Sequence, residues 1–397
     1  MFQRSLKKSI TFWEAISIVV GIIIGSGIFL KTGVVFQNAG SPYMGVIAWL
    51  AGGVITLTSA LTIAEISSAI PKTGGIYTYL KVLYGDVLAF LLGWVQTIIA
   101  FPASAAALSI AFATFATYFI PLTDIQQKLL AIFVLLFVVT MNIIATKFGG
   151  IIQLISTIGK LIPLVVIIVF GLMKGTVNDF SSIRTSSTPN LGFGAALLST
   201  LWAYDGWAGV TNIAGELKNP SRTLPKAIIL GVSLVIGVYV IFNLALLKVL
   251  PMNEIIRSTK PASDAATMLL GQRGALFVTI GILVSVFGAL NGYILTGSRV
   301  PLAMGQRGQL PFSNYLKAIH PKFNTPANSL VLIAFFAAIY ILSGSFNTLT
   351  DLTVFILWIF FVLTVCGIFI LRRRNDIAKA AYKVPFYPIV PLIGILG

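Results

Sequence analysis

The chain is a succession of long apolar segments separated by short polar ones. About 20 apolar residues are needed to cross the hydrocarbon core of a bilayer, and segments of that length recur along the whole sequence. We predict ten spanning helices, at residues 11–37, 43–69, 86–119, 127–146, 150–173, 192–217, 224–250, 273–300, 327–344 and 347–371. An eleventh apolar run begins near Tyr387 and reaches Gly397 after too few residues to span, so we expect it to continue in the natural protein. Residues 1–397 therefore read as one transmembrane domain, with spans one to five at about 11–173 and spans six to ten at about 192–371.

Composition supports an integral membrane protein. Hydrophobic residues make up 57% of the chain and charged residues only 10%. In soluble domains about a quarter of the residues are charged. Lys and Arg number 27, with a net charge of +16, which could suggest a nucleic-acid partner. Their distribution favours a membrane instead, because eighteen fall on the side of the N-terminus and eight on the other. The positive-inside rule then predicts a cytoplasmic N-terminus.

Cysteine and histidine are too scarce for several kinds of chemistry. The single cysteine, Cys366, lies in the apolar tenth span, so it can form neither an intrachain disulfide nor a redox pair. The single histidine, His320, lies in a basic loop. We therefore expect no metal site, no cofactor and no catalytic centre built on histidine.

The first span is interrupted at mid-length, where residues 21–29 read GIIIGSGIF. A break in lipid strands backbone N–H and C=O groups, so it persists only where it is buried in protein or lines a cavity. The half-helix that starts near Ser26 offers N–H groups and a positive dipole end to a carboxylate. The half-helix that ends near Ile23 offers carbonyls to an ammonium group or a cation. A plainer alternative is helix packing, because Gly21 and Gly25 form a G-x-x-x-G motif.

The sixth span carries a second interruption, at residues 204–207, which read YDGW. The two interrupted spans are five apart and run in opposite directions, which predicts a five-plus-five inverted repeat. Asp205 has two interpretations. It caps a half-helix that starts at Gly206, which we favour, or it binds a proton or a cation.

Lys160 lies about ten residues into the fifth span, roughly 15 Å deep and near the midplane. Its ammonium cannot easily reach the membrane surface, so we expect it to face the protein interior and to pair with carbonyls or a carboxylate. The alternative is an interhelical strut without a role in transport.

Other polar residues in apolar spans are less informative. Glu14 and Glu65 lie near the ends of their spans, where a solvated interfacial acid is the ordinary explanation. Tyr239, Ser285 and Asn291 could line a cavity, but they are equally typical of hydrogen bonds between helices.

Several segments together resemble a known transporter family. They are IGSGIF in the first span, AEISSAIPKTGGIYTYL after the second, GKLIP in the fifth, AYDGW in the sixth and GELKNPSRTLPKAI after it. This combination resembles the amino acid–polyamine–organocation superfamily, and within it the L-amino acid transporter branch, with bacterial serine/threonine and alanine–serine–cysteine exchangers. The resemblance implies a LeuT-type all-α fold of twelve spans, with broken helices one and six and alternating access around a site between them.

The resemblance also implies roles for individual residues. Around Gly25, the N–H groups of Ser26, Gly27 and Ile28 would hold a substrate carboxylate. The carbonyls expected to receive the amino group belong to Ile23, Trp202, Ala203 and Asp205. Trp202 would close the site from outside, and Tyr239 would lie beside it. Lys160 matches a lysine that takes the place of a sodium ion in sodium-coupled relatives. Residues expected to restrict the volume of the pocket are Trp202, Ala208, Ser285 and Ala289.

We therefore predict a sodium-independent antiporter of neutral, small L-amino acids such as Ala, Ser, Thr and Cys. The first alternative is a proton- or sodium-coupled symporter of the same fold that uses Asp205 or Glu14. A channel or membrane enzyme is an alternative of a different class, and the sequence shows neither a catalytic set nor repeated charged rings. Animal members of the branch bind a heavy subunit through a cysteine between spans three and four. The matching stretch, FIPLTDIQQK, has none, which predicts an unpartnered bacterial transporter.

Overall fold

The protein is an all-α bundle. The computed structural model describes residues 10–144, 146–177, 192–374 and 380–397, and for residues 146–155 it describes the backbone alone. The helices are α1 Phe12–Ile23, α2 Gly27–Ala39, α3 Pro42–Ala69, α4 Gly75–Tyr84, α5 Asp86–Trp94, π-helical η1 Val95–Ala100, α6 Phe101–Ala116, α7 Asp124–Ile144, α8 Thr146–Lys174, α9 Phe193–Tyr204, α10 Gly209–Asn212, 3₁₀-helical η2 Ala214–Glu216, α11 Pro220–Val249, α12 Met252–Arg257, α13 Pro261–Gly297, α14 Arg299–Gln306, α15 Ser313–Leu316, α16 Ala327–Ser343, α17 Phe346–Leu371 and α18 Ile389–Leu396. Within these ranges the only bridge of β type joins Ile10 and Leu217.

Seven helical segments of the described chain are long and apolar enough to span a bilayer. An eighth is the pair α1 and α2, which is bent by 42° at its break. The apolar helices α9 and α16 are shorter. Each of the ten predicted spans overlaps one of these helices or helix pairs, so the prediction of an all-α polytopic membrane protein is confirmed. The predicted eighth span matches the part of α13 that follows the kink at Gly271, whose φ is 71°, and residues 261–270 form a further helical segment before that kink.

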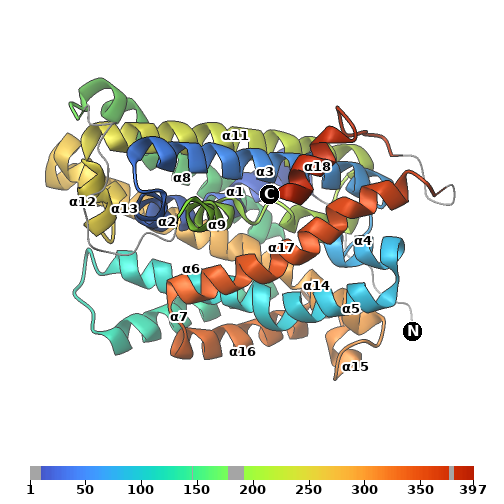
Figure 1. Cartoon of the computed structure of the whole chain (residues 1–397). Coiled ribbons are helices and arrows are strands. Elements are labelled where there is room, and N and C mark those ends of the chain that lie inside the picture. The colour runs from blue at the N-terminus through green and yellow to red at the C-terminus, as the bar shows by residue number, and fades with distance from the viewer. Residues whose placement is uncertain (1–9, 145, 178–191, 375–379) are drawn as a thin grey trace.

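The two broken helices lie in the middle of the bundle. Figure 1 shows α3 and α11 along one side of them and α6, α7 and α16 along the other. Helix α1 packs against α8, α11 and α13, whereas α2 packs against α9. The short helix α12 lies at one end of the bundle, and α4, α14 and α15 lie at the other (Figure 1). Both breaks are therefore enclosed by protein rather than exposed to lipid.

Helix starts follow local sequence signals. Thr11 and Glu14 form a capping box at the start of α1. The side chains of Ser41 and Ser345 accept backbone N–H groups at the starts of α3 and α17. Each of these caps satisfies backbone N–H groups that the start of a helix leaves without a partner inside the helix.

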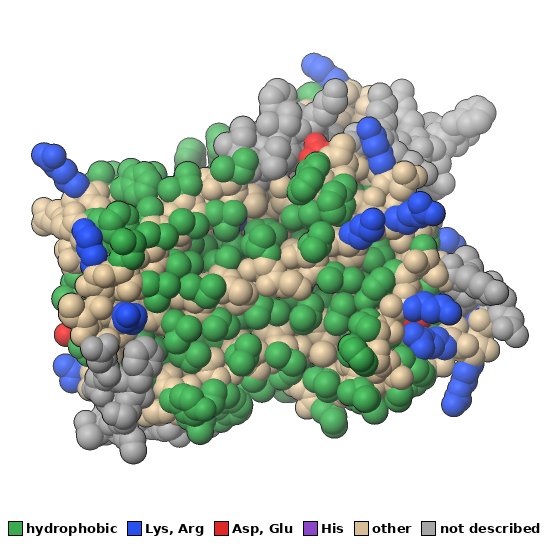
Figure 2. Space-filling model, turned by 90° about the horizontal axis from the view of Figure 1, so that it is seen from above, with side chains coloured by type: hydrophobic (Ala, Val, Ile, Leu, Met, Phe, Trp, Pro, Cys, Tyr) green, Lys and Arg blue, Asp and Glu red, His purple; other side chains and the backbone are tan. Residues whose placement is uncertain are grey.

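The surface has the distribution expected of a membrane protein. Figure 2 shows hydrophobic side chains across the middle of one face, with Lys and Arg gathered toward its ends. Large apolar side chains that face outward include Phe133, Leu234, Phe335 and Phe355. Such an apolar belt needs a lipid environment, so the chain is a multi-pass membrane protein.

Candidate functional site

The first break combines a change in helix direction with close packing. Helix α1 ends at Ile23, and α2 begins at Gly27 with Ser26 as its N-cap. A methyl group at Gly25 would lie 2.9 Å from the Cβ atom of Ala289, and one at Gly27 would lie 2.6 Å from the Cα atom of Ala203. Glycine is required at both positions because the neighbouring helices come so near. The same turn is therefore a break in the helix and, at Gly25 and Gly27, a surface of close packing.

The second break separates α9 from α10. Helix α9 ends at Tyr204, and α10 begins at Gly209 with Ala208 as its N-cap and no side-chain capping bond. The predicted helix cap by Asp205 is therefore wrong. Its carboxylate interacts locally with the N–H group of Gly206 and accepts a hydrogen bond of 2.7 Å from the Tyr293 hydroxyl. The turn needs Gly206, whose φ is 101°, so the second half-helix starts later than the sequence suggested.

Lys160 is fully buried, and its ammonium binds the end of the first half-helix. Nζ donates to the carbonyls of Gly21 at 2.6 Å and Ile24 at 2.7 Å. It thus faces the protein interior and pairs with carbonyls, as predicted. The Ser285 hydroxyl adds a third donor at 3.1 Å from the Ile24 carbonyl. These donors satisfy carbonyls that the break would otherwise leave exposed.

Tyr239 completes this arrangement from α11. Its buried hydroxyl donates to the Ile23 carbonyl at 2.9 Å, and the Gly25 N–H group donates to the same oxygen at 2.8 Å. The Tyr239 ring packs edge-on against Trp49, with 5.6 Å between the centroids. Ile23, Tyr239 and the turn around Gly25 therefore meet at one point, as the resemblance implied. In this conformation the Ile23 carbonyl is already hydrogen-bonded.

A small cavity lies beside the second break. Its volume of about 30 Å³ admits one or two water molecules and is too small for an amino acid. Asp205 and Ala208 lie in its wall, whereas Ser285 and Ala289, also expected to shape a pocket, contact the first break instead. An amino acid can enter only if the helices around the cavity move apart.

The cavity wall contains polar side chains that the sequence analysis missed. They are Gln96, Ser104, Asn212, Tyr293 and Thr296. The amide oxygen of Gln96 is buried without a hydrogen-bond partner among the described residues. Ser104 lies beside the Tyr293 hydroxyl. Single polar residues in apolar spans carry no sequence signal that distinguishes a cavity wall from a contact between helices.

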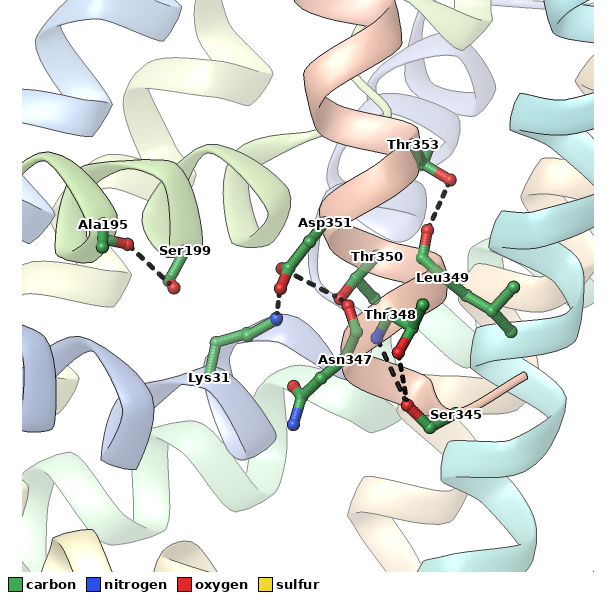
Figure 3. A network of polar contacts seen from close by, with 10 residues as sticks. All are labelled: Lys31, Ala195, Ser199, Ser345, Asn347, Thr348, Leu349, Thr350, Asp351 and Thr353. Carbon is green, nitrogen blue, oxygen red and sulfur yellow. Dashed lines mark hydrogen bonds and ion pairs between the residues drawn. The ribbon is translucent and has the colours of Figure 1, made fainter. Parts of the chain in front are cut away.

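One end of the site is closed by contacts among α2, α9 and α17. The buried Lys31 of α2 forms an ion pair of 2.8 Å with Asp351 of α17, which is half exposed (Figure 3). The Lys31 ammonium also lies 5.7 Å from the ring centroid of Phe346. The Trp202 ring packs edge-on against Phe346, with 6.3 Å between the centroids. Trp202, the predicted gate residue, therefore lies within a cluster that links three helices.

The other end is closed by a buried ion pair. The Arg299 guanidinium donates to both carboxylate oxygens of Glu216, at 2.8 and 3.1 Å. It also donates to the Leu295 carbonyl and the Ser298 hydroxyl. This pair links the segment after α10 to the junction of α13 and α14, and the sequence analysis did not identify it.

The two acids assigned to the membrane interface differ in environment. Glu14 is partly exposed and caps α1, which fits that assignment. For Glu65 the assignment is wrong, because this residue is buried and receives two hydrogen bonds from Arg372 and one from the Val384 N–H group. Its partners lie more than 300 positions away in the chain, where no local pattern could show them.

Comparisons with known proteins identify the family of this chain. A family described as amino acid permease matches residues 10–397. The serine/threonine exchanger SteT of Bacillus subtilis is 44% identical over 396 residues, which cover 100% of this chain and 90% of that protein. The human b(0,+)-type amino acid transporter 1 is 32% identical over 98% of this chain and 80% of its own length. The human large neutral amino acids transporter small subunit 2 is 32% identical over 98% and 74%. The chain therefore belongs to the amino acid permease family of the amino acid–polyamine–organocation superfamily, whose members are transporters rather than enzymes.

Proposed function

We propose that the chain is a sodium-independent exchanger of small neutral L-amino acids, with Ala, Ser, Thr and Cys as substrates. The observation that carries this proposal is the Lys160 ammonium, which is bound to the Gly21 and Ile24 carbonyls. Carbonyl oxygens at a helix break are the ligands that a coupled sodium ion would need, and a tethered cation already uses these two. The similarity to a serine/threonine exchanger supports the same conclusion.

The two breaks would hold the zwitterion of the substrate. We assign its carboxylate to the N–H groups of Ser26, Gly27 and Ile28, because no side chain caps the start of α2. The amino group would meet carbonyls of Ile23, Trp202, Ala203 and Asp205. A carbonyl oxygen can accept two hydrogen bonds, so a carbonyl with one protein donor can still accept one from the substrate. The Ile23 carbonyl already accepts two, from Tyr239 and Gly25, and would have to lose one of them when the substrate binds. Trp202 would close over the bound amino acid.

The cavity wall favours a small side chain that carries a hydroxyl group. Asp205 and Ser104 could accept its proton, and Gln96 offers an amide oxygen without a partner. A purely apolar side chain would leave the Ser104 hydroxyl and the Gln96 amide oxygen without a partner, which costs free energy. We therefore expect Ser and Thr to be exchanged faster than Val.

The proposal includes topology and location. We infer a five-plus-five inverted repeat with a cytoplasmic N-terminus, in the cell membrane of a bacterium. The bias of Lys and Arg toward one side and the bacterial relative support this arrangement. Cys366, the only cysteine, lies within α17, which supports an exchanger without a disulfide-linked subunit.

Transport in proteoliposomes tests the proposal. Labelled serine should enter liposomes loaded with unlabelled serine and should not enter empty ones. A sodium gradient or a pH gradient should leave the rate unchanged. Gradient-driven uptake into empty liposomes would refute exchange.

One observation favours a second candidate, proton-coupled symport. Asp205 is a buried carboxylate beside the cavity, and such groups can carry a proton across a membrane. The same assay separates the two, because a symporter concentrates serine in empty liposomes when the outside is acidic. Asp205→Asn would then abolish the response to pH.

A further inference from the structure

A wide groove opens on the surface where α1 and α11 begin. Its walls include Phe12 of α1, Arg222 and Lys226 of α11, and Tyr382 of the segment that precedes α18. Its volume of about 1060 Å³ is far larger than that of the cavity at the helix breaks, from which it is separate. None of the roles proposed above involves it.

The groove is strongly basic. Arg222 and Lys226 are exposed on its wall, and the exposed Lys218 and Lys383 directly adjoin lining residues. No Asp or Glu lines it, and among the described residues no carboxylate lies within ion-pair distance of these four cations. The positive end of the α11 dipole adds to the same field. An anion would therefore be attracted here without displacing a protein partner.

The groove lies at the boundary between the apolar belt and the charged end of the bundle. Trp13, next to Phe12, is 71% exposed, and Phe386, close to Tyr382 in the chain, is 79% exposed. Exposed aromatic rings are typical of the headgroup level of a membrane. Leu230 lines the groove, and Leu234 follows one turn later on the same face of α11. This apolar track leads from the basic groove into the lipid-facing surface.

We propose that this groove binds the headgroup of an anionic glycerophospholipid. The phosphate would lie between Arg222 and Lys226, where the guanidinium can donate two hydrogen bonds to its oxygens. One acyl chain would follow Leu230 and Leu234. A soluble anion would contact the cationic side chains but not the apolar track, whereas a lipid would contact both. Because α1 and α11 both contribute to the walls, a bound lipid would contact the helix that leads to the first break.

Native mass spectrometry of the delipidated full chain tests the site. The wild type should bind dioleoylphosphatidylglycerol in preference to dioleoylphosphatidylcholine. Loss of both charges in Arg222→Gln with Lys226→Gln should weaken phosphatidylglycerol binding about 25-fold, at about fivefold for each charge. Phosphatidylcholine binding should not change. The two single variants, each about fivefold weaker, supply the test if the double variant does not elute as a monodisperse species.

A matched control removes two exposed lysines elsewhere, in Lys317→Gln with Lys322→Gln. This variant should bind phosphatidylglycerol as the wild type does. Equal weakening in both double variants would overturn the proposal, because attraction would then come from total charge. Unchanged binding in the groove variant would also overturn it. Glycerol 3-phosphate should fail to displace the lipid, and displacement at comparable concentration would refute a lipid as the occupant.

Discussion

The role of Lys160 can be tested by removing its ammonium while keeping the fold. In Lys160→Ala, the Gly21 and Ile24 carbonyls lose donors at 2.6 and 2.7 Å, although Ser285 still binds the Ile24 carbonyl. Lys160→Met removes the charge but keeps an unbranched apolar chain in the same space. The two variants together separate the effect of the ammonium from the effect of an empty volume.

The expected size of the effect follows from these two hydrogen bonds. A hydrogen bond to a charged group contributes about 1.5–3 kcal/mol, so two contribute about 3–6 kcal/mol to the arrangement of the break. Even about 3 kcal/mol corresponds to more than a hundredfold change in the population of the binding-competent conformation. We therefore expect both variants to exchange serine at less than about 1% of the wild-type rate. They should remain monodisperse and helical, because the interfaces among the other helices are unchanged.

The assay is serine exchange in proteoliposomes, normalised to folded protein, together with the thermal unfolding midpoint. Lys128→Met is the matched control, because this exposed lysine also donates to a backbone carbonyl, that of Leu342, at 2.8 Å. It should transport normally. The reasoning would be refuted if Lys160→Ala and Lys160→Met lowered the unfolding midpoint while folded molecules exchanged serine at the wild-type rate. That result would make Lys160 a strut.

Three further substitutions test the packing and the closed ends. Gly27→Ala should abolish exchange and destabilise the fold by about 1–3 kcal/mol, because its methyl group would meet the Ala203 backbone. The control Gly194→Ala places its methyl group in open space and should be neutral or slightly stabilising. Serine exchange and the thermal unfolding midpoint are measured for both variants. Asp351→Asn leaves the buried Lys31 ammonium without its counter-charge and should clearly lower the thermal unfolding midpoint. Asp86→Asn, in a largely exposed ion pair, should change the midpoint little. Equal shifts in the two variants would contradict the importance of burial. Arg299→Gln should lower the free energy of unfolding by about 3–5 kcal/mol, because Glu216 would stay buried and unpaired. The double variant Arg299→Met with Glu216→Leu should recover much of this stability. If the double variant is as unstable as the single one, the arginine stabilises the fold through its other contacts.

Both helix breaks could be located from the sequence, because glycine clusters and charged residues rarely occur in the middle of a spanning helix unless they have a structural or functional role. Gly25, Ser26 and Gly27 weaken a helix that lipid would otherwise enforce, and Asp205 with Gly206 does the same in the sixth span. The span pattern also predicted the bundle, since apolar length is read directly from the chain. Lys160 could be assigned to the interior because its depth excludes contact with water.

Pairings between distant residues could not be predicted in this way. Glu65 lies near the end of its span in sequence, yet Arg372 and the chain around Val384 fold over it and exclude water. Asp205 was wrongly assigned as a helix cap because the turn extends to Ala208, and its partner Tyr293 comes from α13. In both cases the deciding contact forms only when helices far apart in the chain pack together. Local propensity does not encode such contacts.

The ion pairs at the two ends of the site differ in a way that bears on exchange. Lys31 pairs with an Asp351 carboxylate that is already 51% exposed, so separating them lets water replace a contact that is partly hydrated. Arg299 and Glu216 are both buried, and the guanidinium also binds the Leu295 carbonyl and the Ser298 hydroxyl. Separating this pair breaks the two hydrogen bonds between them and leaves two buried charges that need water at once. In an exchanger of the proposed kind, the end closed by Arg299 and Glu216 is therefore the harder one to open. A substrate can promote that opening only by the free energy with which it binds the open form more tightly than the closed form. An empty carrier lacks this contribution, so it does not return without a substrate.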